Sequence, residues 1–244
     1  MTTTRPQRLR AEILIVLAVT FGISGLRAIL RLINALAAPE ALNDQSVTLN
    51  ASQSTLAWVD IGLQLCSAIA LFAYGALALF LLAGDGIRMP GWKRGDLLHG
   101  MGLAAIIGIP GLALYVTALQ LGLTKEVVPT DFDNTWIELP ALLLHSAANA
   151  FGEEVVVVFW LLTRLRTLGW GLPAALAASS ILRGTYHLYQ GVSAGFGNII
   201  MGLLYGYYFH RTGRVWPLVI AHFLIDAVAF TGYALIDDLS FLGL

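Results

Sequence analysis

The stretch Leu56–Ala83, LAWVDIGLQLCSAIALFAYGALALFLLA, decides the fold class of this chain. It runs for 28 residues and contains one charged side chain, Asp60. A helix needs about 20 consecutive, mostly apolar residues to cross the hydrocarbon layer of a bilayer. The alternation of apolar and polar residues that marks membrane β-strands is absent from it. The stretch therefore predicts a transmembrane helix.

The whole chain shares this composition. Of its 244 residues, 57% are hydrophobic and 12% are charged, whereas soluble domains carry about 25% charged residues. So few charges cannot cover a soluble surface, which excludes a secreted globule, a nucleic-acid-binding protein with a basic face and a disordered chain. The single cysteine, Cys66, excludes a disulfide scaffold and a zinc site built from cysteines. We predict an all-α, polytopic membrane protein.

Seven stretches are long enough, or nearly long enough, to cross the bilayer as helices. They are Ala11–Leu36, Leu56–Ala83, Leu97–Leu123, Leu139–Leu162, Leu172–Gln190, Ala194–Phe209 and Val215–Ile236. A backbone in lipid must satisfy its own hydrogen bonds, which a helix does within one segment. No internal repeat or linker divides the chain. We therefore predict a single membrane domain, residues 1–244, with about seven spans.

Basic residues indicate how this bundle sits in the membrane. Cytoplasmic loops carry an excess of Lys and Arg. Here basic residues gather before the first predicted span and after the second, fourth and sixth, whereas the alternate loops hold Lys125 alone. The N-terminus is therefore predicted to be cytoplasmic, in a multi-pass protein of the inner membrane of a bacterial-type cell.

Ionisable residues inside the spans are the most informative positions. Each costs about 2.5–3.5 kcal/mol at the centre of a membrane helix, so such residues persist where they are paired or functional. Arg27 and Arg31 lie in the first span and Asp60 in the second. We interpret the arginines either as partners of Asp60 in a structural ion pair or as residues whose long side chains reach the membrane–water interface.

A denser set of polar residues lies in the fourth, fifth and seventh predicted spans. Its members are Asn149, Glu153, Glu154, Arg183, His187, His222 and Asp226. On each helix two of them lie four residues apart and so share a face. Because none of these faces can meet lipid cheaply, we expect the three to converge inside the bundle.

Three functions use such a set of side chains. A buried glutamate beside histidines can act as general base toward a water, while a histidine stabilises the oxyanion. Carboxylates and histidines can instead hold a divalent metal such as zinc, which activates the water. A proton relay in a transporter uses the same residue types. A serine hydrolase or an ordinary zinc protease is disfavoured, because the chain has neither G-x-S-x-G nor H-E-x-x-H.

The order of three motifs, each on its own apolar helix, resembles the CPBP family of CAAX prenyl endopeptidases and bacteriocin-processing or self-immunity proteins. The motifs here are Glu153-Glu154, then His187, then His222-x-x-x-Asp226. The family pattern runs E-E-x-x-x-R, F-x-x-x-H and H-x-x-x-N or H-x-x-x-D. The resemblance makes residues 139–236 the catalytic core, whereas residues 1–138 carry no recognised motif.

The resemblance implies an intramembrane, metalloprotease-like endopeptidase. Glu153 would activate the attacking water together with His187, and Glu154 would assist. His222 and Asp226 would stabilise the oxyanion, or Glu153, His187 and His222 would bind a divalent metal. Asn149 is a candidate supporting residue. The implied substrate is a prenylated or other membrane-associated peptide or protein, and the alternative is a non-catalytic immunity protein that keeps the fold.

Two positions depart from the family pattern. Val158 stands where the family has an arginine, and Arg183 stands where it has a phenylalanine. We predict that Arg183 supplies from the fifth span the positive charge that Val158 does not, and that it pairs with Glu153 or Glu154. The alternative is a site that has drifted and lost its activity.

Depth in the membrane is a second test of convergence. At 1.5 Å per residue, Glu153 lies about 16 Å from Arg164 and His222 about 10 Å from Val215, both at the cytoplasmic face. Both depths suit a cavity that opens toward the cytoplasm. His187 comes out at about 22 Å, which is too deep for the same cavity. A later start of the fifth helix, a bend at Gly184 or a wrong boundary would each explain the difference.

Overall fold

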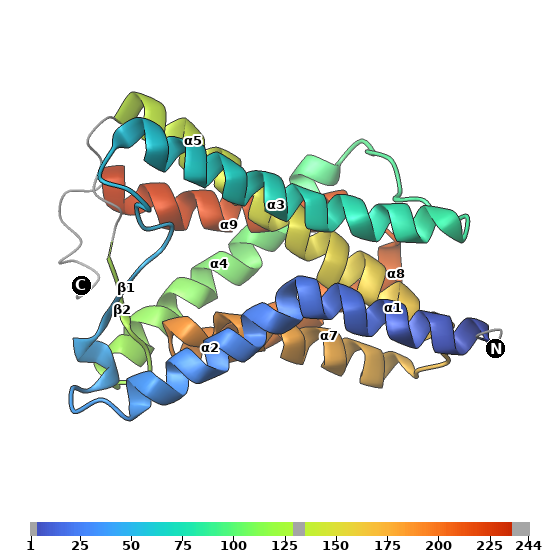
Figure 1. Cartoon of the computed structure of the whole chain (residues 1–244), viewed down its shortest axis with the longest axis horizontal. Helices are drawn as coiled ribbons and strands as arrows, with labels where there is room; N and C mark the ends of the chain where they lie inside the picture. The colour runs from blue at the N-terminus through green and yellow to red at the C-terminus, as the bar shows by residue number, and fades with distance from the viewer. Residues whose placement is uncertain (1–3, 129–134, 236–244) are drawn as a thin grey trace.

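The computed structural model of this chain describes residues 4–128 and 135–235, most of which are helical (Figure 1). The helices are α1 (Arg5–Val19), α2 (Phe21–Leu36), α3 (Ala57–Gly84), α4 (Asp96–Gln120), α5 (Thr135–Glu153), α6 (Leu161–Thr167), α7 (Leu172–His187), α8 (Val192–Thr212) and α9 (Trp216–Leu235), with the short turns η1 (Leu42–Asp44), η2 (Glu154–Trp160) and η3 (Leu188–Gln190). The all-α fold class is confirmed. Ile236, the predicted end of the last span, lies outside the described residues.

Three long helices have the length and composition of membrane spans. Within the described part of the chain they are α3, α4 and the continuous run Leu139–Thr167, and the bent pair α1–α2 makes a fourth if it counts as one span. Each of the seven predicted spans coincides with a helix or a pair of helices. However, α7 has 16 residues, fewer than the roughly 20 that a simple crossing requires. The count of seven spans and the cytoplasmic N-terminus therefore stay predictions.

The first predicted span, Ala11–Leu36, is two helices bent by 50°. At the break the Thr20 hydroxyl donates a hydrogen bond to the Val16 carbonyl at 2.6 Å, and back-bonding of this kind bends helices. The bend lays α2 along α7 (Figure 1). There Gly25 allows close contact, because a Cβ at this position would come within 3.1 Å of the Thr185 methyl group.

The fourth predicted span, Leu139–Leu162, continues to Thr167 and contains a π-helical turn. This turn, η2, begins directly after Glu153, and each of its seven side chains is 4% exposed or less. The Ser179 hydroxyl of α7 donates to the Val157 carbonyl at 2.7 Å, which satisfies one backbone acceptor of the widened turn. π-helical turns occur frequently at functional sites, and this one follows the first motif.

The apolar core surrounds η2. Its valines, Phe159 and Trp160 pack with residues of α3, α6, α8 and α9. α7 and α8 approach closely on one side of this core, because a Cβ at Gly184 would lie 2.5 Å from the Gly195 carbonyl oxygen. Small residues permit such contact between membrane helices. The packing places the ends of α5, α7 and the middle of α9 around one point.

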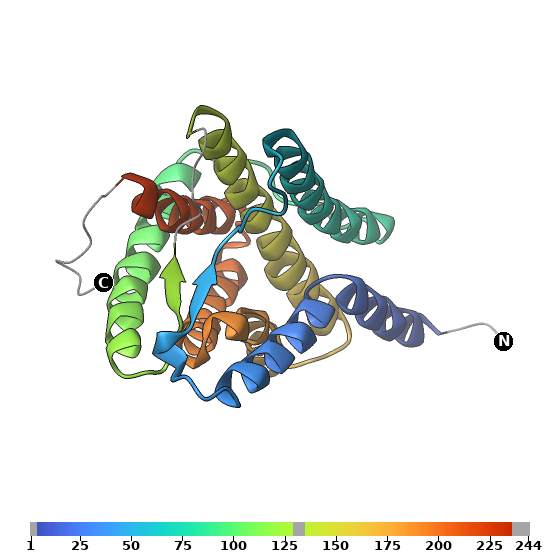
Figure 2. The same cartoon turned by 60° about the vertical axis from the view of Figure 1, so that its left-hand side comes forward.

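Two short strands, which the sequence analysis did not predict, cross one end of the bundle in the segments between predicted spans. β1 (Ser46–Thr48) pairs in parallel with β2 (Glu126–Val128). Figure 2 shows the two strands in front of α7 and α8. The Lys125 amide donates to the Gln190 carbonyl at 2.9 Å, which ties this pair to the turn after α7. Strands of three residues leave too short a pattern to be recognised in the sequence.

Candidate active site

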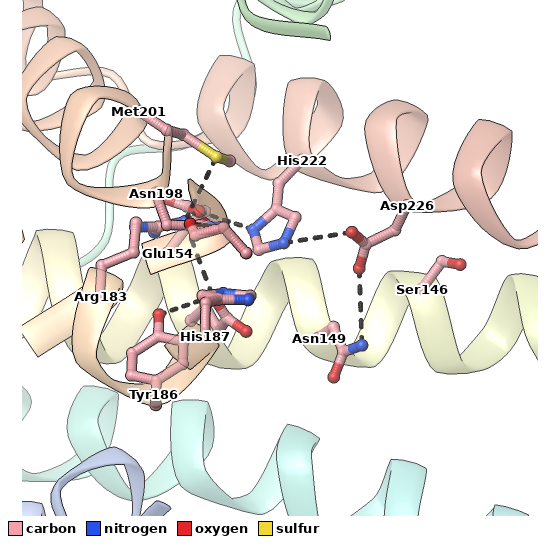
Figure 3. Close-up of polar contacts among 12 residues, drawn as sticks. Ser146, Asn149, Glu154, Arg183, Tyr186, His187, Asn198, Met201, His222 and Asp226 are labelled. Carbon is pink, nitrogen blue, oxygen red and sulfur yellow. Dashed lines mark hydrogen bonds and ion pairs between the residues drawn. The ribbon is translucent and has the colours of Figure 1, made fainter. Parts of the chain in front are cut away.

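Three helices bring the predicted polar residues together (Figure 3). The junction of α5 and η2 supplies Glu153 and Glu154, α7 supplies Arg183 and His187, and α9 supplies His222. Neighbouring members of this set lie between 2.5 and 3.7 Å apart. Residues separated by up to 69 positions in the sequence thus form one connected cluster, as convergence of the three polar faces predicts.

Arg183 lies at the centre of this cluster. Its side chain has no exposed surface, and Nη2 donates to Glu154 Oε1 at 2.5 Å. Nη1 lies 3.6 Å from Glu153 Oε2. Val158 is fully buried in the apolar core. The prediction that Arg183 provides the cation beside the glutamate pair, in place of Val158, is therefore confirmed.

Glu154 is enclosed and holds His222. Its side chain is 0% exposed, and the oxygen bound by Arg183 also lies 2.7 Å from His222 Nδ1. On the other side of the ring, Nε2 lies 3.6 Å from Asp226 Oδ1. Asn149 donates in turn to Asp226 Oδ2 at 3.5 Å, and its supporting role stays a prediction. Glu154 thus contacts Arg183 and His222 from a fully buried position.

Glu153 and His187 form the more accessible part of the cluster. The two side chains are 8% and 17% exposed, and His187 Nε2 lies 3.7 Å from Glu153 Oε2. Neither ring nitrogen of His187 has a hydrogen-bond partner among the described residues. Buried polar atoms in proteins are almost always bonded, so these nitrogens mark where a water or a substrate group binds.

Tyr186, next to His187 on α7, also belongs to this cluster. Its hydroxyl donates to Glu153 Oε2 at 2.6 Å, and its ring packs on Phe21 at a centroid distance of 5.0 Å. Neighbouring residues of a regular helix do not face the same partner, so its place beside His187 gave no signal. Both reach Glu153 because α7 ends at His187 and continues as the tighter turn η3.

The depth of His187 agrees with that of Glu153 once the observed helix ends are used. Glu153 lies 14 residues before Thr167, and His187 lies 15 residues after Leu172. These counts correspond to about 21 Å and about 23 Å at 1.5 Å per residue. The predicted depth of Glu153 was counted from Arg164, three residues before the observed helix end, whereas His222, six residues after Trp216, still comes out at about 9 Å.

The members of the cluster differ in exposure. Between the cluster and the end that carries Arg164 lies η2, whose side chains are buried, and Tyr205 beside it is 0% exposed. The more exposed members, His187 and Asp226, are 17% and 18% exposed. The predicted opening of the site toward the cytoplasm stays a prediction.

The predicted metal ligands do not form a metal site as placed. No group of three His, Cys, Asp or Glu side chains in residues 4–128 and 135–235 is arranged to hold a metal ion. Glu153 and His187 approach each other, whereas His222 directs one ring nitrogen to Glu154 and the other toward Asp226. A zinc site needs three or four protein ligands directed toward one common position. The arrangement therefore does not fit a zinc ion, and the metal stays a prediction.

Comparison with known proteins identifies the part of the chain that carries this cluster. Residues 135–228 match the family model described as Rce1-like, type II CAAX prenyl endopeptidase Rce1-like. No curated protein and no solved structure matches the chain significantly. The matched range begins with α5, ends within α9 and includes all three motifs. Over residues 135–228 this membrane protein therefore carries a domain of the Rce1-like type II CAAX prenyl endopeptidase family, as the resemblance of its motifs implied.

Proposed function

We propose that the protein is an intramembrane endopeptidase that hydrolyses peptide bonds in membrane-associated substrates. The observation that carries this proposal is the pairing of Glu153 with His187 at the accessible edge of a buried polar cluster. A carboxylate held beside an unpartnered imidazole is suited to general-base activation of a water. The family match over residues 135–228 supports the same reaction class.

Glu153 acts as the general base. It takes a proton from a water molecule while the water oxygen bonds to the carbonyl carbon of the scissile peptide, and the carbonyl electrons move onto its oxygen. His187 orients the water or the substrate through its unpartnered ring nitrogens. When the tetrahedral intermediate collapses, the C–N bond breaks and the proton on Glu153 passes to the leaving amine.

His222 stabilises the oxyanion through Nε2. Glu154 holds the other ring nitrogen, Nδ1, at 2.7 Å, whereas Nε2 lies 3.6 Å from Asp226 Oδ1, beyond hydrogen-bond distance, and can donate to the substrate. A donor already oriented where negative charge develops is the largest contribution in many acyl-transfer enzymes, because nothing has to reorganise during the reaction. Asn149 restrains Asp226 and so acts through it.

Arg183 and Tyr186 hold the glutamate pair in place. Two adjacent carboxylates repel each other in a buried site, and the Arg183 guanidinium offsets both charges. The Tyr186 hydroxyl fixes the same Glu153 oxygen that faces His187. The base therefore stays in one orientation before substrate arrives, which reduces the reorganisation that the reaction requires.

We further propose a multi-pass protein of the inner membrane with seven spans and a cytoplasmic N-terminus, which the distribution of Lys and Arg supports. The proposed substrates are membrane-associated or prenylated peptides and proteins, which reach a site that opens toward the cytoplasm. A divalent metal such as zinc stays a prediction, and the reaction above is written without one.

Single substitutions test the proposal. The variants Glu153→Ala, Glu154→Ala, His187→Ala and His222→Ala should each lower peptide hydrolysis by a factor of roughly 10² or more. His210→Ala, at the exposed end of α8, is the matched control and should keep wild-type activity. The assay follows farnesylated and unmodified peptides in detergent by mass spectrometry.

The outcomes separate the rival functions. Full activity in all four variants contradicts the proposal. Absence of hydrolysis in the wild type, with both peptide sets, supports the non-catalytic immunity protein. Ion-dependent solute uptake in proteoliposomes, which a protease should not show, supports a transporter.

A further inference from the structure

A group of buried polar atoms without partners adjoins the catalytic cluster, between η2, α7 and α8. Four side-chain atoms there have no hydrogen-bond partner among residues 4–128 and 135–235: Glu154 Oε2, Ser180 Oγ, Arg183 Nε and Tyr205 Oη. All four residues are 0% exposed. Roughly 90% or more of the buried polar groups in proteins are hydrogen-bonded. Four unpartnered atoms in one region therefore indicate a bound ligand.

The four residues form one contiguous group around the Arg183 side chain. Nη2 of Arg183 donates to Glu154 at 2.5 Å, and Cζ lies 5.7 Å from the centroid of the Tyr205 ring. Ser180 lies one turn before Arg183 on the same face of α7. On α8, Gly202 lies one turn before Tyr205 and packs on Ser180, because a Cβ at Gly202 would come within 3.1 Å of Ser180 Oγ.

The contacts of the catalytic cluster leave two of these atoms unused. Oε1 of Glu154 receives both Arg183 and His222, so Oε2 of the same carboxylate has no role there. Nη1 of Arg183 contacts Met201 Sδ at 3.8 Å and lies 3.6 Å from Glu153, which leaves Nε as the remaining donor. A carboxylate oxygen and a guanidinium N–H thus remain available to a ligand on the side of Ser180 and Tyr205.

The chemistry of the four atoms identifies this ligand. Arg183 Nε can only donate, the ionised Glu154 oxygen can only accept, and the two hydroxyls can do both. A cation is disfavoured by the guanidinium, and an anion is disfavoured by the carboxylate. A water molecule accepts from the donors and donates to the carboxylate. Buried waters typically make about three hydrogen bonds to groups of this kind.

We propose that one or more water molecules are bound inside the protein between η2, α7 and α8. They connect Glu154 Oε2 and Arg183 Nε with the hydroxyls of Ser180 and Tyr205. This water network fixes the second oxygen of the carboxylate whose first oxygen holds His222. Ser180 and Tyr205 are therefore positioning residues that act on His222 through water and Glu154.

Removal of single hydroxyls tests the water network by the sign of its effect. Tyr205→Phe and Ser180→Ala each remove one hydroxyl. If these hydroxyls bind water, each change removes a hydrogen bond, and Tm should fall by about 1–6 °C. If the hydroxyls were buried without any partner, their removal would relieve a desolvation cost and Tm would rise. A Tm that rises or stays unchanged in either variant overturns the proposed site.

Two control variants calibrate these shifts. Tyr207→Phe alters a tyrosine of the same helix that is 50% exposed, and it should leave Tm unchanged. Ser179→Ala removes a buried hydroxyl that donates to the Val157 carbonyl at 2.7 Å, and it gives the loss expected for a satisfied serine. The double variant Ser180→Ala with Tyr205→Phe should lose less Tm than the sum of the two single losses, because both hydroxyls belong to one network. Additive losses contradict a shared network.

The water can also be observed directly. A crystal structure of the wild type that resolves ordered waters should show an oxygen within hydrogen-bond distance of Glu154 Oε2 and of one of the two hydroxyls. Density for this oxygen should be lost or displaced in Tyr205→Phe. A wild-type structure without it overturns the proposal.

Kinetics test the positioning role separately. Well below Tm, Tyr205→Phe should lower kcat for peptide hydrolysis roughly 2- to 10-fold with KM unchanged, as expected for the loss of one hydrogen bond that supports His222. A wild-type kcat in this variant contradicts the positioning role. If the wild type hydrolyses no peptide, the endopeptidase function fails, whereas the shifts in Tm and the density still decide the water site.

Discussion

Loss of the Arg183 guanidinium should destabilise the fold and the site together. In Arg183→Gln the side chain stays polar but becomes shorter, and the 2.5 Å contact with Glu154 and the 3.6 Å contact with Glu153 lose their positive charge. Removing one partner of a buried ion pair costs about 3–5 kcal/mol. For a chain of this size each kcal/mol lowers Tm by about 2–4 °C, so Tm should fall by about 6–20 °C.

Moving the charge tests whether its position in the sequence matters. The double substitution Val158→Arg with Arg183→Phe restores the family pattern on both helices. Val158 lies four residues after Glu154, so an arginine there shares the face of that glutamate. Val158→Arg alone adds a second cation to a fully buried position and should destabilise the protein. In the double variant the two changes should compensate, with a coupling free energy of about 0.5–3 kcal/mol.

Thermal unfolding in detergent, followed by tryptophan fluorescence, gives the Tm of the wild type, of Val158→Arg, of Arg183→Phe and of the double variant. Hydrolysis of a peptide substrate is measured on the same preparations. Arg183→Lys is the control that keeps the charge but not the planar group. An Arg183→Gln protein with the Tm and activity of the wild type refutes the reasoning. So does a double variant whose loss of stability equals the sum of the two single losses.

Three further predictions follow from other contacts. Tyr186→Phe keeps the packing on Phe21 but removes the hydrogen bond to Glu153. In this variant kcat should fall about tenfold with KM unchanged, and the pH–rate profile should shift. An unchanged pH–rate profile would limit the role of this tyrosine to packing. The hydrogen bond from Arg164 lowers the pKa of Asp85 below its usual 3.8, so the stabilisation by Asp85 is present above about pH 4 and is lost as pH falls through the lowered pKa. Asp85→Asn should cost about 1.5–3 kcal/mol at pH 7 and should flatten the dependence of Tm on pH below about pH 4. Dialysis against a chelator tests the predicted metal: a loss of peptide hydrolysis that zinc restores would establish it, whereas unchanged hydrolysis would support the reaction on Glu153 and His187 alone.

The helical fold and the convergence of the site were accessible from the sequence for one physical reason. Lipid tolerates long apolar helices and disfavours isolated charges, so few polar residues remain inside the bundle and these must meet. The contact between Arg183 and the glutamates followed from the same reasoning, because a buried carboxylate pair requires a cation near it.

Other features had no signal in the sequence. The valines of η2 suit an α-helix as well as a π-helical turn, and Thr20 looks like any polar residue in a span. Tyr186 resembles the many aromatic residues that pack in membrane helices, until its hydroxyl is seen to bind Glu153.

Hydrolysis in water enriched in oxygen-18 tests the central claim most directly. If Glu153 activates water for attack on a peptide carbonyl, the new carboxylate should contain one heavy oxygen in the wild-type reaction. The Glu153→Gln protein, which keeps the shape of the side chain, should form product at a rate lower by a factor of roughly 10² or more. A Glu153→Gln protein that releases labelled product at the wild-type rate would contradict the assignment of Glu153 as the base.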